Sequence, residues 1–352
     1  MRIGWIVGLF GLFLVPQGAV AAQTGGPDGI AVHYIDVDQG AAAVVEFPCG
    51  AVMIDAGGRA ARRHLLSYLD AFFARRTDLD HRFKAVIITH THLDHNAYLL
   101  NVIDRYFVDA YIETGRINGQ VSQAMPGRLA RKGIRHVVVT EADIAAAGRS
   151  GVTNSAIDGV DCQGVDPVIR VLSGARTRNP GWDAKSFANE NNHSLVIRID
   201  YGQSSFLWTG DMQEPALRRM MARYDGTAML DADVYEAGHH GSHNATNPEL
   251  LVAVSPKMAV ISMGHRESRS AKTAWDYGHP NKGVVEMLEG VITAPREPVD
   301  AFVGDGAHNL VAHRELKAIY ATGWDGDVVV TGDAAGNLGV RVDASGTTLA
   351  DQ

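Results

Sequence analysis

The sequence has few cysteines, no excess of positive charge and no obvious boundary between domains. Lys and Arg number 32 against 40 Asp and Glu, so the formal net charge of the 352-residue chain is −8 at pH 7. This composition does not favour a protein that tracks nucleic acid over its whole surface. No linker rich in proline or serine and no internal repeat divides the chain. The length and the 46% hydrophobic content suffice for one large domain or two modest ones.

The two cysteines of the chain are Cys49 and Cys162. Neither lies near a histidine or another cysteine in the sequence, so they are poor candidates for metal ligands. They could pair in an oxidising compartment, or they could be two separately buried thiols. The sequence leaves both alternatives open.

The apolar run near the N-terminus is typical of a secretory signal peptide. Arg2 precedes the apolar residues 3–15, and small residues close the segment at Ala21 and Ala22. We predict a signal peptide over residues 1–22, a disordered leader over residues 23–29 and one folded domain over residues 30–345. An uncleaved anchor is the alternative, but the run is short for a membrane span of about 20 residues. Cleavage implies a periplasmic or secreted protein without an integral membrane segment.

Apolar, β-branched runs alternate with helical patterns along most of the chain. Three strands in quick succession, at residues 30–35, 41–47 and 51–54, predict an antiparallel meander. Strands and helices then alternate, which is typical of an α/β fold. The predicted helices of this part cover residues 59–76, 95–107 and 122–132, the last one broken at Pro126. Later elements are a hairpin at residues 194–209, a helix at residues 280–289, and strands at residues 319–330 and 338–342.

Polar residues of the kind that bind metals follow four of the predicted strands. They are Asp55, the run His90–His95 (His-Thr-His-Leu-Asp-His), Asp211 and the pair His239-His240. A single aspartate after a strand is explained by turn preference alone, but four such positions with two histidine clusters are not. If these strand ends converge, they supply the ligands of a two-metal site.

The spacing within the histidine run assigns ligands to two ions. In a tight turn, His90 and His92 can bind the first ion, while Asp94 and His95 at the start of the next helix can bind the second. Asp211 can bridge the two, because a carboxylate has two oxygens, and His240 completes the second ion. The first ion then lacks a ligand. The two ions would lie about 3.5–4 Å apart.

His193, which precedes the strand at residues 194–200, is the candidate for that missing ligand. A hydroxide held by the ions would be the nucleophile, since bound cations lower the pKa of water toward 7. Two zinc ions are expected, with manganese or iron as alternatives.

These residues form motifs that resemble the metallo-β-lactamase superfamily over nearly the whole predicted domain. The motif that contains the double histidine, residues 237–242, and the motif around His279, residues 277–280, resemble more particularly one branch. That branch includes the extracellular hydrolase domain of the competence DNA-uptake protein and the phosphorylcholine esterases. The motifs in question are His90–His95, residues 53–57, 191–196, 208–211, 237–242, 277–280 and 320–326. One departure lies at residues 37–41, where Asp38 stands in place of the glycine usual in that branch.

The resemblance implies a four-layer αβ/βα sandwich and an exported, metal-dependent hydrolase of the phosphodiesterase type. It makes His90, His92, Asp94, His95, Asp211 and His240 metal ligands, with Asp55 holding a ligand histidine in orientation. It also places His239 and His279 at the site as catalytic residues beside Asp94. The implied substrate is a small ester or a nucleic-acid phosphodiester, and the negative net charge disfavours the second.

Three other functions compete with this prediction. They are a lactonase or β-lactamase of the same fold, a binding module without catalysis, and an iron oxidoreductase. The binding module predicts decayed ligands, whereas this set is intact, and the oxidoreductase usually needs a partner domain that is not visible. The oligomeric state is not predicted.

Several other residues are expected to have structural roles. Asp333 repeats the Thr-Gly-Asp pattern of Asp211, but no helix follows it, so we interpret it as a turn. Histidines without partners in the sequence are predicted to be structural or solvated: His33, His64, His136, His243, His265, His308 and His313.

Overall fold

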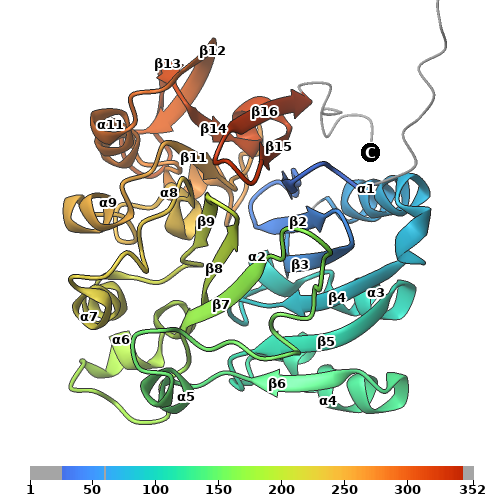
Figure 1. Ribbon diagram of the computed structural model, residues 1–352. Coiled ribbons are helices and arrows are strands. Elements are labelled where there is room, and N and C mark those ends of the chain that lie inside the picture. The colour runs from blue at the N-terminus through green and yellow to red at the C-terminus, as the bar shows by residue number, and fades with distance from the viewer. Residues whose placement is uncertain (1–25, 59–60, 344–352) are drawn as a thin grey trace, which may run out of the picture.

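The computed structural model describes residues 26–58 and 61–343. The predicted signal peptide and the first part of the predicted leader therefore lie outside the described residues. Two β-sheets face each other, and helices cover the outer face of each (Figure 1). No described helix is both long and apolar enough to cross a membrane.

The larger sheet has eight strands. In spatial order they are β16 (Leu338–Asp343), β15 (Asp327–Gly332), β1 (Ile30–Tyr34), β2 (Ala42–Phe47), β3 (Gly50–Ala56), β4 (Arg82–Ile87), β5 (Phe107–Glu113) and β6 (Arg135–Val138). Strands β1, β2 and β3 are antiparallel neighbours, as the meander predicted. From β3 to β6 the neighbours are parallel, so their carboxyl ends meet at one edge.

The second sheet has six strands. In spatial order they are β14 (Ile319–Ala321), β11 (Met258–Ile261), β10 (Val234–Glu236), β9 (Ser204–Trp208), β8 (Val196–Tyr201) and β7 (Val168–Ser173). Strands β8 and β9 form the predicted hairpin, and β9, β10, β11 and β14 are parallel. A separate hairpin consists of β12 (Pro295–Gly304) and β13 (Leu310–Lys317).

The helices are short and lie mostly between strands. They are α1 (Arg62–Arg75), α2 (Leu93–Asn96), α3 (Leu99–Arg105), α4 (Gly119–Lys132), α5 (Glu141–Ala146), α6 (Ala184–Ala188), α7 (Glu214–Tyr224), α8 (Gly238–Gly241), α9 (Pro248–Val254), α10 (Ala274–Tyr277), α11 (Lys282–Val291) and α12 (Thr322–Asp325). Two 3-10 turns cover Thr77–Leu79 and Glu190–His193.

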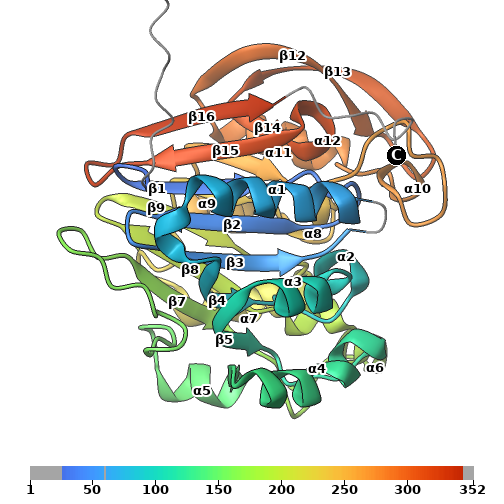
Figure 2. The same cartoon turned by 90° about the vertical axis from the view of Figure 1, so that its right-hand side faces the viewer.

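Strand residues divide between two apolar cores according to the face they point to. Met53 packs outward with Leu65 of α1, and Figure 2 shows α1 and α3 lying over the larger sheet. Its neighbour Val52 points inward and shares a core with Ile197 of β8 and with Leu217 of α7 on the far side of the second sheet. Alternation with period two is what a strand buried on both faces requires. The layers therefore confirm the four-layer αβ/βα sandwich.

Two predicted helices differ from the structure. The helix predicted over residues 95–107 is divided into α2 and α3, because the Tyr98 N–H donates to the carbonyl of Ala56 on β3 at 2.8 Å instead of continuing the first helix. Helix α4 runs through Pro126 without a break. Pro126 lies on the exposed face, where the carbonyl that loses its helical partner can be hydrated.

The prediction of one continuous strand over residues 319–330 was also wrong. Its two halves, β14 and β15, belong to different sheets and are separated by α12. The chain turns at Gly326, whose φ of 72° is a conformation that glycine adopts without steric cost. The hairpin β12–β13 and the short helix α5 were not predicted at all.

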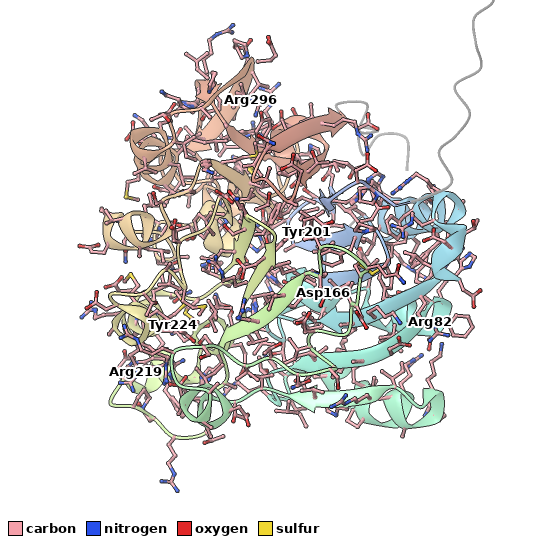
Figure 3. All side chains as sticks on the ribbon, viewed as in Figure 1. Arg82, Asp166, Tyr201, Arg219, Tyr224 and Arg296 are labelled. Atoms are coloured by element: carbon pink, nitrogen blue, oxygen red, sulfur yellow. A yellow bond between two sulfur atoms is a disulfide. The ribbon has the colours of Figure 1, made fainter. Side chains whose placement is uncertain are left out.

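Cys49 and Cys162 form a disulfide, which decides between the two alternatives left by the sequence. The bond links the β2–β3 turn to the segment before β7 across 113 residues (Figure 3). Beside it, the Cys162 N–H donates to the Asp166 carboxylate at 2.9 Å. The disulfide therefore ties the larger sheet to the second sheet.

Candidate metal centre

The four predicted strand ends meet at one edge of the two sheets. Asp55 lies at the end of β3, the run His90–His95 follows β4, Asp211 follows β9, and His239-His240 follow β10. Strand β3 is parallel to its neighbour β4, and strand β9 is parallel to its neighbour β10. The carboxyl ends of each pair therefore lie at the same edge of their sheet. Asp55, His239 and His240 have φ values of 57°, 52° and 56°. Such left-handed backbone is uncommon outside glycine and concentrates at functional sites.

One group of possible ligands consists of Asp94, His95, Asp211 and His240, with one donor atom of each within 4.8 Å of the others. His95 Nδ1 lies 2.7 Å from Asp55 Oδ2, and His240 Nδ1 lies 2.7 Å from the carbonyl of Ser262. Both Nδ1 atoms are therefore donors, which leaves each Nε2 as the atom that a cation can bind in place of a proton. These Nε2 atoms are buried and make no hydrogen bond, although His95 Nε2 faces Asp211 Oδ1 at 3.1 Å.

A second group consists of His90, His92 and again Asp211. His90 Nε2 lies 3.1 Å from His92 Nδ1 and 3.7 Å from Asp211 Oδ2. The carboxylate of Asp211 is thus common to both groups, with Oδ1 toward His95 and Oδ2 toward His90. This is the arrangement expected of a carboxylate that bridges two cations.

The protonation states of both groups suit cation binding. Burial alone would raise the pKa of Asp211, but the imidazole of His95 and its neighbours outweigh burial and hold that pKa well below its usual range. Burial is likewise outweighed at Asp94, whose pKa is lowered by the nearby imidazoles of His240, 3.6 Å away, and His95. Burial and the neighbouring His95 lower the pKa of His90 well below its usual value. Burial alone would lower the pKa values of His95 and His240, but the charge of Asp211 outweighs burial and raises both. A cation at this group would therefore displace protons from these two imidazoles, because ionised carboxylates and neutral imidazoles are the forms that bind metals.

The donor set therefore fits a pair of divalent transition cations. Imidazole and carboxylate are ligands for zinc, iron and manganese. The two buried, unpartnered Nε2 atoms of His95 and His240 would otherwise cost free energy as unsatisfied polar groups. Asp55 holds His95 as predicted, and it also accepts hydrogen bonds from the Thr89 N–H and hydroxyl, each at 2.7 Å.

His193 does not join the site, which contradicts the prediction that it is the third ligand of the first ion. Its Nε2 lies 2.8 Å from the carbonyl of Phe187, and its Nδ1 accepts the N–H of Arg176 at 3.1 Å. Both ring nitrogens are therefore used on a neighbouring loop. The buried imidazole closes the turn at the end of Glu190–His193 instead of facing His90.

His239 and His279 both lie at the rim of the site, as predicted. His239 Nε2 is 3.7 Å from Asp211 Oδ2, while its Nδ1 lies 2.9 Å from Asn244 Oδ1 and its Nε2 lies 3.3 Å from Asn191 Nδ2. The ring centroid of His279 is 5.7 Å from that of His239. The His279 Nδ1 is buried and without a hydrogen-bond partner.

Two residues that support the site were missed by the sequence analysis. The Ser262 hydroxyl donates to Glu236 at 2.5 Å, and the Ser262 carbonyl holds His240. Burial raises the pKa of Glu236 to about 7, against the opposing hydrogen bond from Ser262. Glu236 lines a space of about 10 Å³ under Asp211. The sequence signal that could have identified Glu236 is an acidic residue within an apolar strand, two positions before Gly238.

A larger cavity opens in front of the histidine run. Its volume is about 490 Å³, and it is lined by Thr91, His92, Leu93, Asp94, residues 118–121, Lys272 and Tyr277. Lys272 and Tyr277 come from the segment between β11 and α11. The cavity thus brings one cation, Lys272, to the same space as His92 and Asp94.

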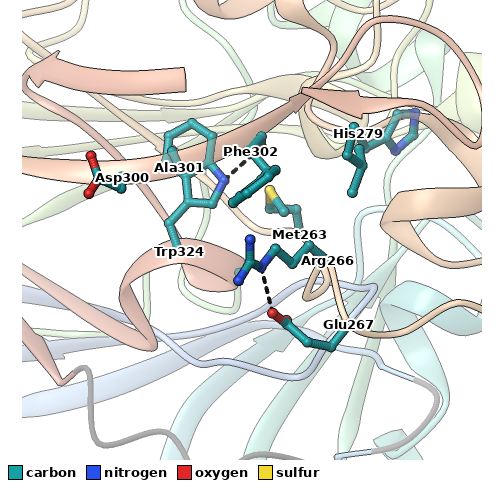
Figure 4. A pocket seen from close by; sticks show the side chains of 10 residues that line it. Met263, Arg266, Glu267, His279, Asp300, Ala301, Phe302 and Trp324 are labelled. Carbon is teal, nitrogen blue, oxygen red and sulfur yellow. Dashed lines mark hydrogen bonds and ion pairs between the residues drawn. The ribbon is translucent and has the colours of Figure 1, made fainter. Parts of the chain in front are cut away.

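His279 lines a second cavity, of about 340 Å³ (Figure 4). Arg266 lies over the ring of Phe302 at 4.0 Å, and the Trp324 indole N–H donates to the Phe302 carbonyl at 3.1 Å. Strand β12 and helix α12 form this wall, so the unpredicted hairpin takes part in shaping the surroundings of the site.

The departure at Asp38 is accommodated locally. Its φ is 58°, a value open to the glycine usual at this position, and its carboxylate accepts the His265 N–H at 3.0 Å. The Ser268 hydroxyl lies 3.2 Å from the other carboxylate oxygen. The Asp38 side chain therefore holds the loop after β11, while the end of the same turn contacts the site through the Ala41 N–H, which donates to the carbonyl of Asp94 at 2.8 Å.

Most histidines expected to have no partner do have one. His33 contacts Glu46, His64 contacts Asp327, and His136 contacts Glu113. The same holds for His265 with Asp36, His308 with Asp276, and His313 with two glutamates. The prediction that they lie outside the site is not affected. Most of these carboxylates come from distant parts of the sequence, whereas Glu315 lies two positions from His313 on β13.

One large family matches the part of the chain that carries the candidate metal centre. The sequence pattern of the metallo-beta-lactamase superfamily matches residues 35–265. ComE operon protein 3 of Bacillus subtilis (strain 168) is 32% identical over 107 residues, which are 30% of this chain and 12% of that protein. Competence protein ComA of Neisseria gonorrhoeae is 32% identical over 96 residues, which are 27% of this chain and 12% of that protein.

The chain thus matches only about an eighth of the length of these two relatives. Among solved structures, the metallo-beta-lactamase fold protein YhfI from Bacillus subtilis is similar, with 10% sequence identity and a TM-score of 0.41 over 75% of this chain and 94% of that chain. Because the superfamily pattern covers more than half of the chain, including Asp55, the run His90–His95, Asp211 and His240, this chain belongs to the metallo-β-lactamase superfamily.

Proposed function

We propose that this chain is an exported hydrolase of phosphodiesters that works with two divalent cations. Asp94, His95, Asp211 and His240 hold one cation, and His90, His92 and Asp211 hold the other. The observation that carries this proposal is the position of Asp211 between the two groups: its Oδ1 lies 3.1 Å from His95 Nε2, and its Oδ2 lies 3.7 Å from His90 Nε2 and 3.8 Å from His240 Nε2. Two bound cations would lower the pKa of a water molecule and polarise the oxygens of a phosphoryl group.

The chain's own residues divide the remaining tasks. Lys272, in the cavity of about 490 Å³ beside His92 and Asp94, attracts the negative charge of a phosphodiester toward the cations. Asn191 and Asn244 fix the His239 ring, so its edge stays directed at the reaction space. The Nδ1 of His279 has no hydrogen-bond partner. Burial and the neighbouring His240 lower the pKa of His279 well below its usual value, so the neutral imidazole can donate a hydrogen bond to the leaving group.

Two observations support export. The residues 1–22 have the composition of a signal peptide, and the Cys49–Cys162 disulfide is a bond that persists in oxidising compartments such as the periplasm or the extracellular space. Fractionation of a cell that produces the full chain tests this directly: the processed protein is expected outside the cytoplasm, and an unprocessed cytoplasmic protein would contradict export.

The hydrolase proposal is tested with the mature chain on bis-p-nitrophenyl phosphate, a phosphorylcholine ester, single-stranded DNA and a cephalosporin. Each is assayed with added Zn²⁺ or Mn²⁺ and with a chelator. We expect chelator-sensitive cleavage of at least one of the phosphodiesters. Cleavage of the cephalosporin alone would move the function to the lactamase class, and no turnover of any substrate would refute a hydrolase.

Asp211→Ala is the decisive variant, and Asp333→Ala is its matched control. Asp333 follows the same Thr-Gly sequence as Asp211 but lies in the turn after β15, where it accepts the N–H groups of Ala335 and Asn337 at 2.9 Å each. We expect Asp211→Ala to abolish turnover and Asp333→Ala to keep it. Unchanged turnover in Asp211→Ala would exclude the two-cation mechanism.

A further inference from the structure

A third group of metal-ligand side chains lies far from the strand ends described above. It consists of Glu289 in the last turn of α11 and of His313 and Glu315 on β13. His313 and Glu315 are two positions apart on one strand, so their side chains point to the same face, which is the face toward α11. One donor atom of each residue lies within 4.8 Å of the other two.

Two of the three residues, His313 and Glu315, have a buried donor atom without a hydrogen-bond partner. Glu315 is 0% exposed. Its Oε1 accepts the N–H groups of Leu316 at 2.8 Å and Lys317 at 2.6 Å, but its Oε2 has no hydrogen-bond partner. The nearby His313 Nε2 is also buried without a hydrogen bond. Buried polar atoms are rarely left in this state.

The charges of the group are not balanced by other side chains. Within residues 26–58 and 61–343, no lysine or arginine forms an ion pair with Glu289 or Glu315, and His313 is the contact of both. Two carboxylates that converge in a partly buried place repel each other, and a bound cation would compensate their charge.

The distances distinguish a coordination site from a set of hydrogen bonds. His313 Nε2 lies 3.3 Å from Glu289 Oε1 and 3.5 Å from Glu315 Oε2. A hydrogen bond between an imidazolium and a carboxylate measures about 2.7–2.9 Å, which is clearly shorter. Ligands that bind one zinc ion tetrahedrally at about 2.0–2.1 Å are separated by about 3.3 Å.

We propose that Glu289, His313 and Glu315 bind a divalent transition cation, of which zinc is the best match. One imidazole and two carboxylates suit zinc, whereas calcium and magnesium prefer oxygen donors throughout. Three protein ligands leave a fourth position for water on the partly exposed side of the group. This ion is separate from the two cations of the proposed function.

The ion fastens the β12–β13 hairpin to α11. The hairpin pairs with no other strand among the described residues. A second attachment comes from Arg296 on β12, which Figure 3 labels, because it forms an ion pair with Asp325 on α12. Because β12 contributes Phe302 to the cavity of about 340 Å³ that His279 lines, the ion fixes a wall near the candidate active site without touching it.

The test counts zinc ions in chains that already carry Asp211→Ala, which removes the carboxylate shared by the other two groups. After equilibrium dialysis against Zn²⁺, the number of zinc ions per chain is measured by inductively coupled plasma mass spectrometry. We expect His313→Ala and the milder Glu289→Gln to remove one equivalent from this background. His136→Ala is the matched control, since His136 contacts a single glutamate, Glu113, at 2.8 Å, and it should remove none.

Thermal unfolding of the same chains gives an independent readout. Zn²⁺ should raise the Tm of the Asp211→Ala chain, because an ion that binds only the folded state stabilises it, and this increase should disappear with His313→Ala or Glu289→Gln. Circular dichroism shows whether each variant is folded. If folded variants of both kinds keep the full zinc content, the third site does not exist, whatever the outcome of the hydrolysis assays.

Discussion

Asp55→Asn is expected to weaken metal binding without unfolding the protein. The carboxylate of Asp55 accepts hydrogen bonds from the Thr89 N–H, the Thr89 hydroxyl and His95 Nδ1, each at 2.7 Å. Asparagine keeps the shape but replaces one oxygen by an NH₂ group. That group meets the N–H of either Thr89 or His95, so one of these donors loses its acceptor. If it is His95, the ring is free to turn its Nε2 away from Asp211.

The magnitude follows from the burial of the pair. Asp55 is 3% exposed and His95 is 2% exposed, so water cannot replace the lost hydrogen bond. A hydrogen bond to a charged group contributes about 1.5–3 kcal/mol, which corresponds to a change of about 10- to 150-fold in an equilibrium constant. Substituting the partner of a metal-binding histidine lowers metal affinity or activity by about 10- to 100-fold. We therefore expect a decrease in zinc affinity of at least about tenfold.

Zinc affinity is measured by competition with a chromophoric chelator, and folding by urea denaturation. Asp327→Asn is the control, because Asp327 also accepts a backbone N–H, that of Asp36 at 2.8 Å, and a histidine, His64 at 2.9 Å, outside the candidate site. The control should keep its zinc affinity. Equal affinities for wild type and Asp55→Asn, or equal losses in both variants, would refute the assigned role of Asp55.

Three further predictions concern stability and substrate binding. Burial opposes ionisation of Glu46, but hydrogen bonds from its imidazole and guanidinium neighbours lower its pKa from 4.5 to about 2, so the folded state gains about 3 kcal/mol above pH 5 that is lost as the pH falls toward 2. Glu46→Gln should therefore lower the free energy of unfolding in urea by about that amount at pH 7 and by much less at pH 3; equal deficits at both pH values would contradict this. Replacing Cys49 and Cys162 by serine opens a loop closed over 113 residues and should cost about 2–5 kcal/mol in the same measurement, whereas a loss below that range would show that the disulfide does not constrain the unfolded chain. Lys272→Ala should raise KM for a phosphodiester about two- to fivefold with little change in kcat, because Lys272 is exposed and exposed charges contribute about 0.2–1 kcal/mol; an unchanged KM would remove Lys272 from substrate binding.

The site could be predicted from the sequence wherever a residue's position depends on the end of a strand. Asp55, His95, Asp211 and His240 each follow an apolar run closely, and parallel strands bring their carboxyl ends to the same edge of a sheet. For these four residues, the local sequence pattern and the strand topology were together sufficient to predict their position in the site. The assignment of His240 over His239 rested on resemblance, and in the structure both adopt left-handed backbone, while the carbonyl of Ser262 holds only His240.

His193 shows where that reasoning fails. It too stands next to an apolar strand, but its ring nitrogens contact the backbone of Phe187 and Arg176, in a stretch where the sequence predicted no element between residues 172 and 191. The direction of a side chain at a loop end depends on which neighbouring backbone reaches it, and no periodicity carries that information. The β12–β13 hairpin escaped prediction for a related reason: charged residues such as Arg296, Asp300 and Arg314 interrupt the apolar alternation of its strands.

The loss of His193 from the ligand set makes the two groups unequal. In the group of Asp94, His95, Asp211 and His240, both imidazoles are held by buried acceptors, Asp55 and the Ser262 carbonyl, at 2.7 Å. The His90 and His92 group has three donors, and His90 Nδ1 has the Thr89 hydroxyl at 3.2 Å as its partner. Preorganised ligands bind more tightly because their ordering cost is met in folding. The four-residue group should therefore fill first, and the three-residue group should depend on the cation concentration.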